Sequence, residues 1–281
     1  MKHSEDTIAR IKELHGKNLS LREIANVVFG SVTKKSTVGS ILSRGVEKKV
    51  DNSRILFISD LHIPFHHKDS FAFLQHLKKK YNPTRVICLG DELDKHSLSF
   101  HDSDPDLYSA GDELKASLPF IRELEDMFPV MDIVESNHGS LVWRKAKANG
   151  IPRHYIKSYN DVLGVGEGWK WHFDLTIDLP DGNKCYVHHG KSSDIVKLSQ
   201  AMSMNAVSGH FHEKFRIDFW ANPNSLYWGM SCGCLVNDDS YAFAYNSVNI
   251  KRPLIGTGLI INSLPVLEPM IISKEGNWCA D

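Results

Sequence analysis

The sequence predicts an α/β protein whose chemistry lies at the carboxyl ends of buried strands, preceded by a small all-helical module. Two observations support this prediction. From residue 54 onward, short apolar runs alternate with segments of helical periodicity, and several of the runs end in Asp, Asn or His. The first 49 residues differ in character, because their apolar residues recur at helical spacing.

The composition is that of an ordinary soluble protein with one large domain and a small one. The chain has 281 residues, of which 42% are hydrophobic and 24% charged, and a formal net charge of -1. It shows neither the apolar core of a signal peptide nor a run approaching the ~18 apolar residues of a membrane span. We therefore expect a cytoplasmic protein with no membrane partner. Its five cysteines, an odd number, do not indicate a disulfide framework.

The first domain, residues 1–48, is expected to be all-helical. Apolar residues recur at helical spacing over 8–14. The run Ser20-Leu21-Arg22-Glu23 is a capping box, in which a hydroxyl and a carboxylate satisfy backbone amides at the start of a second helix. After a turn at 29–32, Thr33 is expected to cap a third helix.

These helices resemble a helix-turn-helix, in which the outward face of the last helix enters the DNA major groove. Residues 1–49 contain ten Lys and Arg against five acids, a net charge of +5 that favours a polyanion, with DNA preferred over RNA. The alternative is a trihelical packing or oligomerisation module with a solvated basic face. The expected DNA contacts are Lys34, Lys35, Thr37, Ser40 and Arg44.

A polar stretch over 46–53 is expected to be a linker, and the second domain, residues 54–281, begins at Arg54. Its first apolar run has the pattern of a buried strand and is followed by Asp60 and His62. Open α/β sheets bind their ligands at this edge. An Asp and a His two residues apart at the end of a strand can hold one metal ion from two sides.

The same arrangement recurs at four more strand-like runs. Helices are expected between the first three strands, over 70–80 and 110–128. The further runs and the ligand-type residues that follow them are 85–89 with Asp91 and Asp94, 130–134 with Asn137 and His138, 184–187 with His188 and His189, and 206–208 with His210 and His212.

The motifs D-x-H, G-D-x-x-D, N-H, H-G and G-H-x-H, in this order over residues 54–236, together resemble the calcineurin-like metallophosphoesterase superfamily. The resemblance implies a four-layer αββα sandwich that carries two divalent metal ions. Carried over motif by motif, it implies one metal held by Asp60, His62 and His212, a second held by Asn137, His189 and His210, and Asp91 bridging the two.

The resemblance also implies a reaction. A bridging carboxylate holds two ions close together, and their charge lowers the pKa of a shared water enough to supply a metal-bridging hydroxide that attacks phosphorus. Mixed imidazole and oxygen ligands suit Mn²⁺, with Fe, Zn²⁺ or Ni²⁺ as alternatives, better than Mg²⁺. His138 would stabilise the transition state or protonate the leaving oxygen. Asp94 would orient a metal ligand without binding the metal itself.

Two departures from the family's pattern concern the site. The third motif is usually Gly-Asn-His followed by an acid that often orients the histidine, whereas this chain has Ser136-Asn137-His138-Gly139. His188 and His189 compete for one ligand role, and His189 is preferred because it directly precedes Gly190. Four other histidines fit no ligand position and are expected at the rim or surface: His66, His67, His96 and His101.

The segment after His138 indicates the class of substrate. Residues 139–158 contain five cations and no acid, with aromatic residues interleaved, which suits a phosphodiester backbone and a stacked base. A solvated helix face is the alternative. The expected substrate contacts are Arg144, Lys145, Lys147 and Arg153.

The sequence therefore predicts a metal-dependent phosphoesterase that hydrolyses phosphodiester bonds in nucleic acid, most like a nuclease. Within the enzyme class, the alternative is a nucleotide phosphatase or a cyclic nucleotide phosphodiesterase. Outside it, the alternative is a DNA-binding regulatory protein with a weakly active or inactive sandwich. The complete ligand set favours the enzyme.

Overall fold

The computed structural model describes residues 4–17, 19–45, 50–100, 106–237 and 252–280. The chain divides into two compact units, Met1–Val50 and Asp51–Asp281. Among the helices of the described ranges, none is long and apolar enough to cross a membrane. All five cysteines are free thiols.

The smaller unit is a cluster of short helices around a small apolar core. Its elements are α1 (Glu5–Gly16), α2 (Leu21–Phe29), the 3-10 turn η1 (Val32–Lys34) and α3 (Lys35–Gly45). Ile11, Ile24 and Val38, one from each α-helix, are fully buried against one another. The predicted capping box is confirmed, since Ser20 and Glu23 exchange hydrogen bonds at the start of α2.

The expected role of Thr33 as a helix cap is wrong. Thr33 lies inside η1, which tightens the chain before α3 begins at Lys35. Its hydroxyl contacts the Ser31 hydroxyl at 2.7 Å instead of a backbone amide of the third helix. Short 3-10 turns of this kind are frequent at helix N-termini, and their exact start is not fixed by the cap residue.

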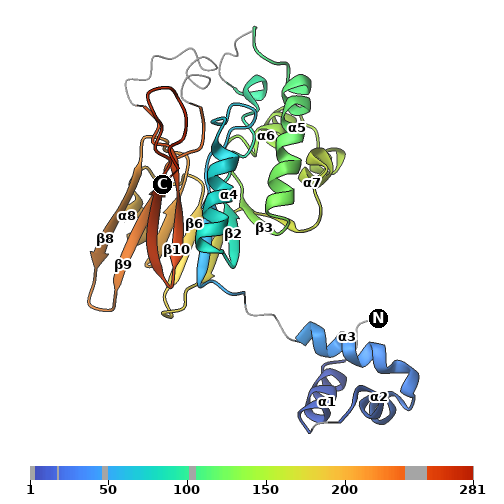
Figure 1. Cartoon of the computed structure of the whole chain (residues 1–281). Coiled ribbons are helices and arrows are strands. Elements are labelled where there is room, and N and C mark those ends of the chain that lie inside the picture. The colour runs from blue at the N-terminus through green and yellow to red at the C-terminus, as the bar shows by residue number, and fades with distance from the viewer. Residues whose placement is uncertain (1–3, 18, 46–49, 101–105, 238–251, 281) are drawn as a thin grey trace. The chain divides into compact units, whose positions relative to one another are not determined.

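The larger unit contains two sheets (Figure 1). The first has the order β11-β10-β1-β2-β3-β4, in which β1 to β4 are parallel and β10 is antiparallel to both β1 and β11. Its strands are β1 (Arg54–Ile58), β2 (Arg85–Cys88), β3 (Met131–Val134), β4 (Trp169–His172), β10 (Gly256–Ile261) and β11 (Leu264–Pro269).

The second sheet has the order β5-β6-β7-β9-β8, with β6, β7 and β9 parallel. Its strands are β5 (Leu175–Asp178), β6 (Lys184–His188), β7 (Asn205–Ser208), β8 (Phe215–Ala221) and β9 (Leu226–Cys232). The helices of this unit are α4 (Ser70–Tyr81), α5 (Ala110–Met127), α6 (Leu141–Ala148), α7 (Tyr159–Leu163) and α8 (Ile195–Met202), with 3-10 turns η2 (His96–Leu98) and η3 (Arg153–Tyr155).

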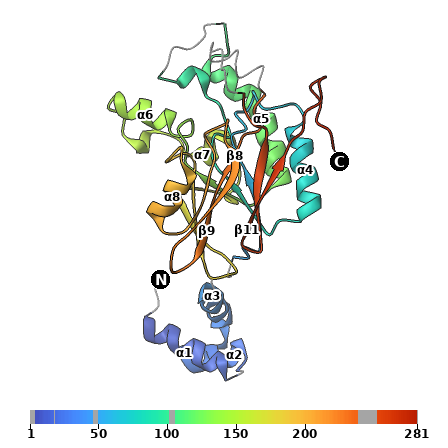
Figure 2. The ribbon, with the colours of Figure 1, turned by 90° about the vertical axis from the view of Figure 1, so that its left-hand side faces the viewer.

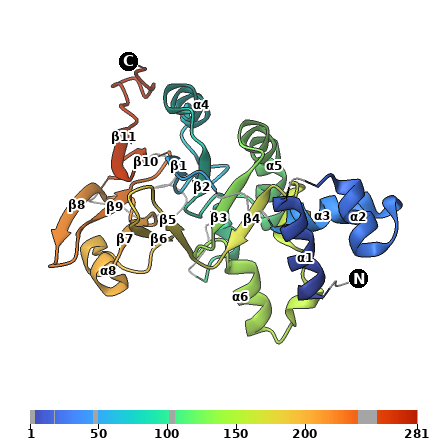
Figure 3. The same cartoon turned by 90° about the horizontal axis from the view of Figure 1, so that it is seen from below.

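The two sheets pack face to face, with α4 and α5 outside the first sheet and α8 outside the second (Figure 3). Alternation along β1 produces this layering, because successive strand side chains point to opposite faces. Leu56 and Ile58 pack toward the helices, while Ile55 and Phe57 pack against the second sheet. The larger unit is therefore a mixed α/β sandwich in the layer order helix, sheet, sheet, helix.

Candidate metal centre

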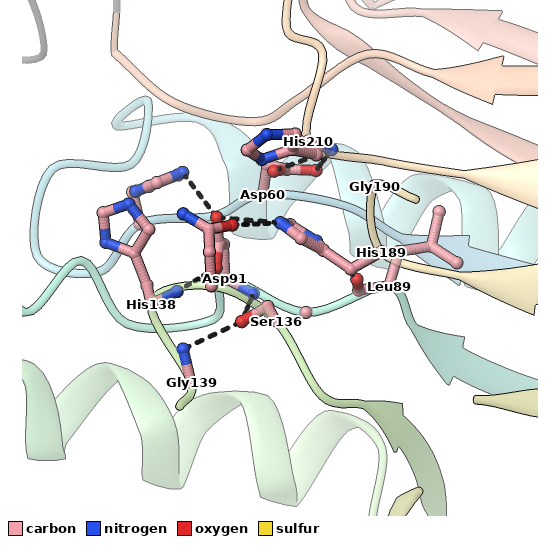
Figure 4. A network of polar contacts seen from close by, with 12 residues as sticks. Asp60, Leu89, Asp91, Ser136, His138, Gly139, His189, Gly190 and His210 are labelled. Atoms are coloured by element: carbon pink, nitrogen blue, oxygen red, sulfur yellow. Dashed lines mark hydrogen bonds and ion pairs between the residues drawn. The ribbon is translucent and has the colours of Figure 1, made fainter. Parts of the chain in front are cut away.

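The carboxyl ends of β1, β2, β3, β6 and β7 meet at one place between the two sheets. Parallel strands end at the same edge of a sheet, so residues from distant parts of the chain converge there (Figure 4). Each predicted ligand follows one of these strands: Asp60 and His62 after β1, Asp91 after β2, Asn137 after β3, His189 after β6, and His210 and His212 after β7.

Ligand atoms gather in groups at this place. Within each of three groups, one ligand atom per residue lies within 4.8 Å of the others. The groups are Asp60, His62 and His212; Asp91, His189 and His210; and His62, Asp91 and His138. Asn137 joins the second group, because its Oδ1 lies 2.7 Å from Nε2 of His189. The first two groups are the sets that the resemblance implied for two metals.

Asp91 lies between the groups. Its Oδ2 is 3.2 Å from Nε2 of His189 and 3.6 Å from Nε2 of His62, and its side chain is almost fully buried. Because it borders ligands of both groups, its carboxylate has the position that a bridging ligand needs.

The imidazoles are held with one nitrogen facing inward. Nδ1 of His62 lies 2.6 Å from Oδ1 of Asp94, and Nδ1 of His189 lies 2.8 Å from the carbonyl oxygen of Leu89. With Nδ1 engaged in this way, Nε2 faces Asp91, and it would offer a lone pair to a metal ion that displaces its proton. Metal-binding histidines in proteins are oriented in this way. The donor set, imidazole nitrogens with carboxylate and amide oxygens, thus fits divalent transition metals.

The backbone is strained at this site. Asp60, His62, Asp91 and His210 have φ values of 49°, 49°, 50° and 70°, in the left-handed region that non-glycine residues rarely adopt. Gly209 allows the second sheet to approach closely, since a Cβ there would lie 2.4 Å from Oδ2 of Asp60. Such strain clusters at functional sites, where the surrounding structure holds it in place.

The buried charges at the site stabilise one another. Burial opposes the charge of Asp91, but the neighbouring His189 and His138 hold its pKa well below the usual range. Burial likewise opposes a charge on His189, yet Asp91 raises the pKa of this histidine to about 9. Burial also opposes ionisation of Asp60, but the hydrogen bond to His212 and the charges of His189 and His212 together lower its pKa. Both carboxylates are therefore ionised at neutral pH and favour cations.

His138 stands beside the ligands and is oriented from two sides. Its Nδ1 donates to the carbonyl oxygen of Asp94, and its backbone N–H donates to Oδ1 of Asp91 at 3.2 Å. Its ring meets that of His62 edge-on, with centroids 4.8 Å apart. The acid missing at position 139 is thus replaced, for orientation, by a backbone carbonyl.

Three residues at this site were not singled out for a role by the sequence reasoning. Ser136 Oγ accepts the N–H groups of Asp91 at 3.0 Å and Gly139 at 2.9 Å (Figure 4). Lys95 Nζ donates to the carbonyl oxygens of His138 and Gly139, both at 3.3 Å, and the Tyr159 hydroxyl donates to the latter at 2.5 Å. For Ser136 the departure from the usual glycine was the available signal.

Of the two adjacent histidines, His189 belongs to one of the three ligand groups, whereas His188 belongs to none of them. His188 Nδ1 accepts the N–H of Gly190 at 3.1 Å, and its ring stacks 6.0 Å from that of Tyr186. Burial then lowers the pKa of His188 to about 4.

The expectation that the other histidines lie at the rim or surface is wrong for His66, His67 and His96, which are all buried. The His66 ring packs edge-on against Phe71 and Phe120, and burial lowers its pKa to about 4. Their burial depends on packing between distant segments, which local sequence does not show. His101 lies outside the described residues.

The predicted substrate contacts lie on α6 and η3, directly after the segment that carries Asn137 and His138. Arg144 and Lys145 lie over the Phe100 ring at 4.9 and 5.6 Å, and Arg153 lies over the Trp143 ring at 5.4 Å. Lys147 is exposed. Cations over aromatic faces are common where proteins contact nucleic acid, although they also occur on plain surfaces.

The predicted DNA contacts lie on η1 and along α3, the last helix of the smaller unit. Lys34 and Lys35 are exposed and Thr37 is half-buried. The side chains of Ser40 and Arg44 are outside the described part of the chain. Figure 2 shows this helix, α3, with α1 and α2.

Comparisons with known proteins find similarity among solved structures only. No protein-family model matches the chain, and no curated protein matches it by sequence. Among solved structures, the chain is similar to Vps29 from Chaetomium thermophilum, with 11% identity over 80% of this chain and 92% of that one and a TM-score of 0.43. It is also similar to Yfce, a phosphoesterase from E. coli, with 12% identity over 81% and 97% and a TM-score of 0.40.

Proposed function

We propose that this chain is a metal-dependent phosphoesterase of the calcineurin-like class, acting on phosphodiester bonds in nucleic acid. The observation that carries the proposal is the pair of ligand groups on either side of Asp91. Seven side chains from five strand ends converge there on one buried place, which a structural role for any single histidine does not explain.

Two divalent ions, Mn²⁺ first among the alternatives, would supply Lewis acidity and lower the pKa of a water at this place. The chain's own residues would bind and position these ions. Asp60, His62 and His212 would hold one ion, and Asn137, His189 and His210 the other. Asp91 would hold both in fixed positions, and its buried carboxylate would need no reorganisation during the reaction.

His138 is the group placed to act on the leaving oxygen. Its Nδ1 proton is engaged with the Asp94 carbonyl, so Nε2 is the atom that would deliver a proton. The fixed ring also supports a purely electrostatic role, in which an imidazolium stabilises charge on phosphate oxygens.

Nucleic acid is the substrate class that the remaining residues support. The cations of α6 and η3 follow the catalytic segment directly, and the aromatic rings beneath them, Phe100 and Trp143, are of the kind on which bases stack. The smaller unit presents Lys34 and Lys35 at the start of α3, where a DNA-binding helix would meet phosphates.

A metal-supplemented assay tests the proposal. Hydrolysis of single-stranded DNA, double-stranded DNA, RNA, mononucleotides and a small aryl phosphodiester would be compared with Mn²⁺ and with chelator. We expect Mn²⁺-dependent cleavage of a polynucleotide and of the aryl diester. Turnover of mononucleotides alone would replace the nuclease by a nucleotide phosphatase. No turnover of any substrate would favour the binding protein.

A further inference from the structure

The carbonyl group that orients His138 belongs to the peptide bond between Asp94 and Lys95. Nδ1 of His138 donates to the carbonyl oxygen of Asp94, and the N–H of the same peptide group, from Lys95, donates to Oε1 of Glu113. A trans peptide group is planar, so its carbonyl and its N–H point in opposite directions and can only turn together. Any group that holds the N–H of Lys95 therefore also holds the acceptor of His138.

Regular secondary structure does not hold this peptide group. It lies between β2 and the 3-10 turn η2, and Lys95 has a φ of 54°, in the left-handed region that side chains with a Cβ rarely adopt. Such a conformation persists only where surrounding contacts fix it. The N–H of Lys95 also lies at the start of η2, where the first amides of a helical turn have no partner within the turn.

Glu113 supplies these partners from α5. Its carboxyl group lies at the start of η2, where the backbone amides of Lys95, His96 and Ser97 donate hydrogen bonds to it. Glu113 is 3% exposed and lies in the first turn of α5, a helix of 18 residues that packs on the first sheet. A side chain on a packed helix holds its partner more precisely than one on a loop.

The carboxylate of Asp94 is engaged with another imidazole. Its Oδ1 lies 2.6 Å from Nδ1 of His62 but 3.8 Å from Nδ1 of His138, which is beyond hydrogen-bond distance. The side chain of Lys95 reaches back to the same segment, because its Nζ donates to the carbonyl oxygens of His138 and Gly139. The Asp94–Lys95 peptide group is thus joined to the segment of His138 at both ends.

We propose that Glu113 is a positioning residue for His138 and acts on it through the Asp94–Lys95 peptide group. This chain has glycine at position 139, and Glu113 supplies from α5 the orientation that the acid of the usual motif supplies next to the histidine. Hydrogen bonds in series polarise one another, so a carboxyl group on the N–H also makes the Asp94 carbonyl a stronger acceptor. The proposal rests on the proposed function only in treating His138 as catalytic.

Proton NMR of the metal-free full chain tests the hydrogen bonds without any turnover. The Nδ1–H resonance of His138 is identified by its loss in His138→Ala, and we expect it to be shifted downfield and slow to exchange. Glu113→Leu should move it upfield and speed its exchange about tenfold, because the peptide group loses its anchor. Glu113→Gln, whose amide oxygen can still accept the Lys95 N–H, should restore both values. An unchanged resonance in Glu113→Leu would overturn the proposal.

Kinetics of the metal-loaded chain separates positioning from a purely structural role. Glu113→Leu should lower kcat for a small aryl phosphodiester about ten- to a hundredfold with KM and metal content unchanged, because a displaced group loses rate without losing ground-state binding. Glu113→Gln should recover most of this kcat. In a His138→Ala background, Glu113→Leu should cause no further loss, since its effect passes through His138. The same loss in both backgrounds would contradict the proposal.

Two further variants keep the test decisive. Ile121→Val, in the buried core face of α5, controls for lost stability and should leave the resonance and kcat as in wild type. If Glu113→Leu does not fold, Glu113→Asp replaces it, because it keeps a carboxyl group but is too short to hold the Lys95 N–H. Wild-type values in Glu113→Asp would then overturn the proposal. The expected NMR changes without turnover in any chain would instead overturn the phosphoesterase and support the link between Glu113 and His138.

Discussion

At the residue scale, Ser136 and Gly139 depart together from the usual third motif, and their contacts explain why. Ser136 Oγ fixes the N–H groups of Asp91 and Gly139, and a Cβ at position 139 would lie 2.9 Å from this oxygen. A side chain at position 139 would therefore require the Ser136 hydroxyl to move away from these hydrogen bonds. The chain instead orients His138 through the carbonyl of Asp94.

If this orientation suffices, His138→Ala should keep the metals and lose most turnover. A group that acts only in the transition state lowers kcat without removing a ligand. We expect kcat to fall on the order of 10² to 10⁴. Kinetics beside elemental analysis checks this, with His154→Ala on the exposed η3 turn as control. A kcat within a few-fold of the wild-type value would show that His138 takes no part in catalysis.

Glu113 makes stability depend on pH. Burial, with the nearby charge of Asp94, raises its pKa to about 7 from an ordinary value of 4.5. The folded state therefore holds this proton more tightly than the unfolded state, so stability falls as pH rises from about 4.5 to 7 and then levels off. A shift of this size corresponds to on the order of 3 kcal/mol.

Glu113→Gln should remove this dependence. Thermal unfolding of the metal-free protein would be followed at pH 5 and pH 8 for both chains. We expect the two to be similar at pH 5 and the variant to be more stable at pH 8. A variant less stable than wild type at pH 8 would mean that the ionised carboxylate is favoured by the amides of Lys95 and its neighbours.

At the element scale, the strands and the residues at their ends were predictable, whereas the relation between elements was not. β1 and β2 are short apolar runs that end in ligand-type residues, so these strands and the side chains after them follow from local pattern. The burial of His66 and the contacts of Lys95 depend on segments far apart in the chain. No periodicity in the sequence reports such contacts.

The role of α6 is open to test by charge reversal. Arg144→Glu with Lys147→Glu should raise KM for a polynucleotide about tenfold and lower the slope of log affinity against log salt by about two. Hydrolysis of a small aryl phosphodiester should be unchanged. Lys184→Glu with Lys197→Glu, on other elements, is a control of equal charge change. Equal effects of the two pairs would identify α6 as a solvated surface.

At the scale of the whole molecule, the division near residue 50 separates a basic helical unit from the unit that contains every predicted ligand. Deleting residues 1–50 should weaken DNA binding and reduce its salt dependence, because phosphate contacts release counterions in proportion to their number. Turnover of a small aryl phosphodiester should stay nearly the same. Equal cleavage of DNA by both chains across a salt series would assign the smaller unit another role.

The central claim is a two-metal centre that depends on Asp91, and elemental analysis of the reconstituted chain tests it most directly. We predict two transition-metal ions per wild-type chain and fewer than one per Asp91→Asn chain, since this carboxylate borders both ligand groups. Asp112→Asn, on the exposed start of α5, should retain both ions. Fewer than one ion per wild-type chain, or two in Asp91→Asn, would contradict the account.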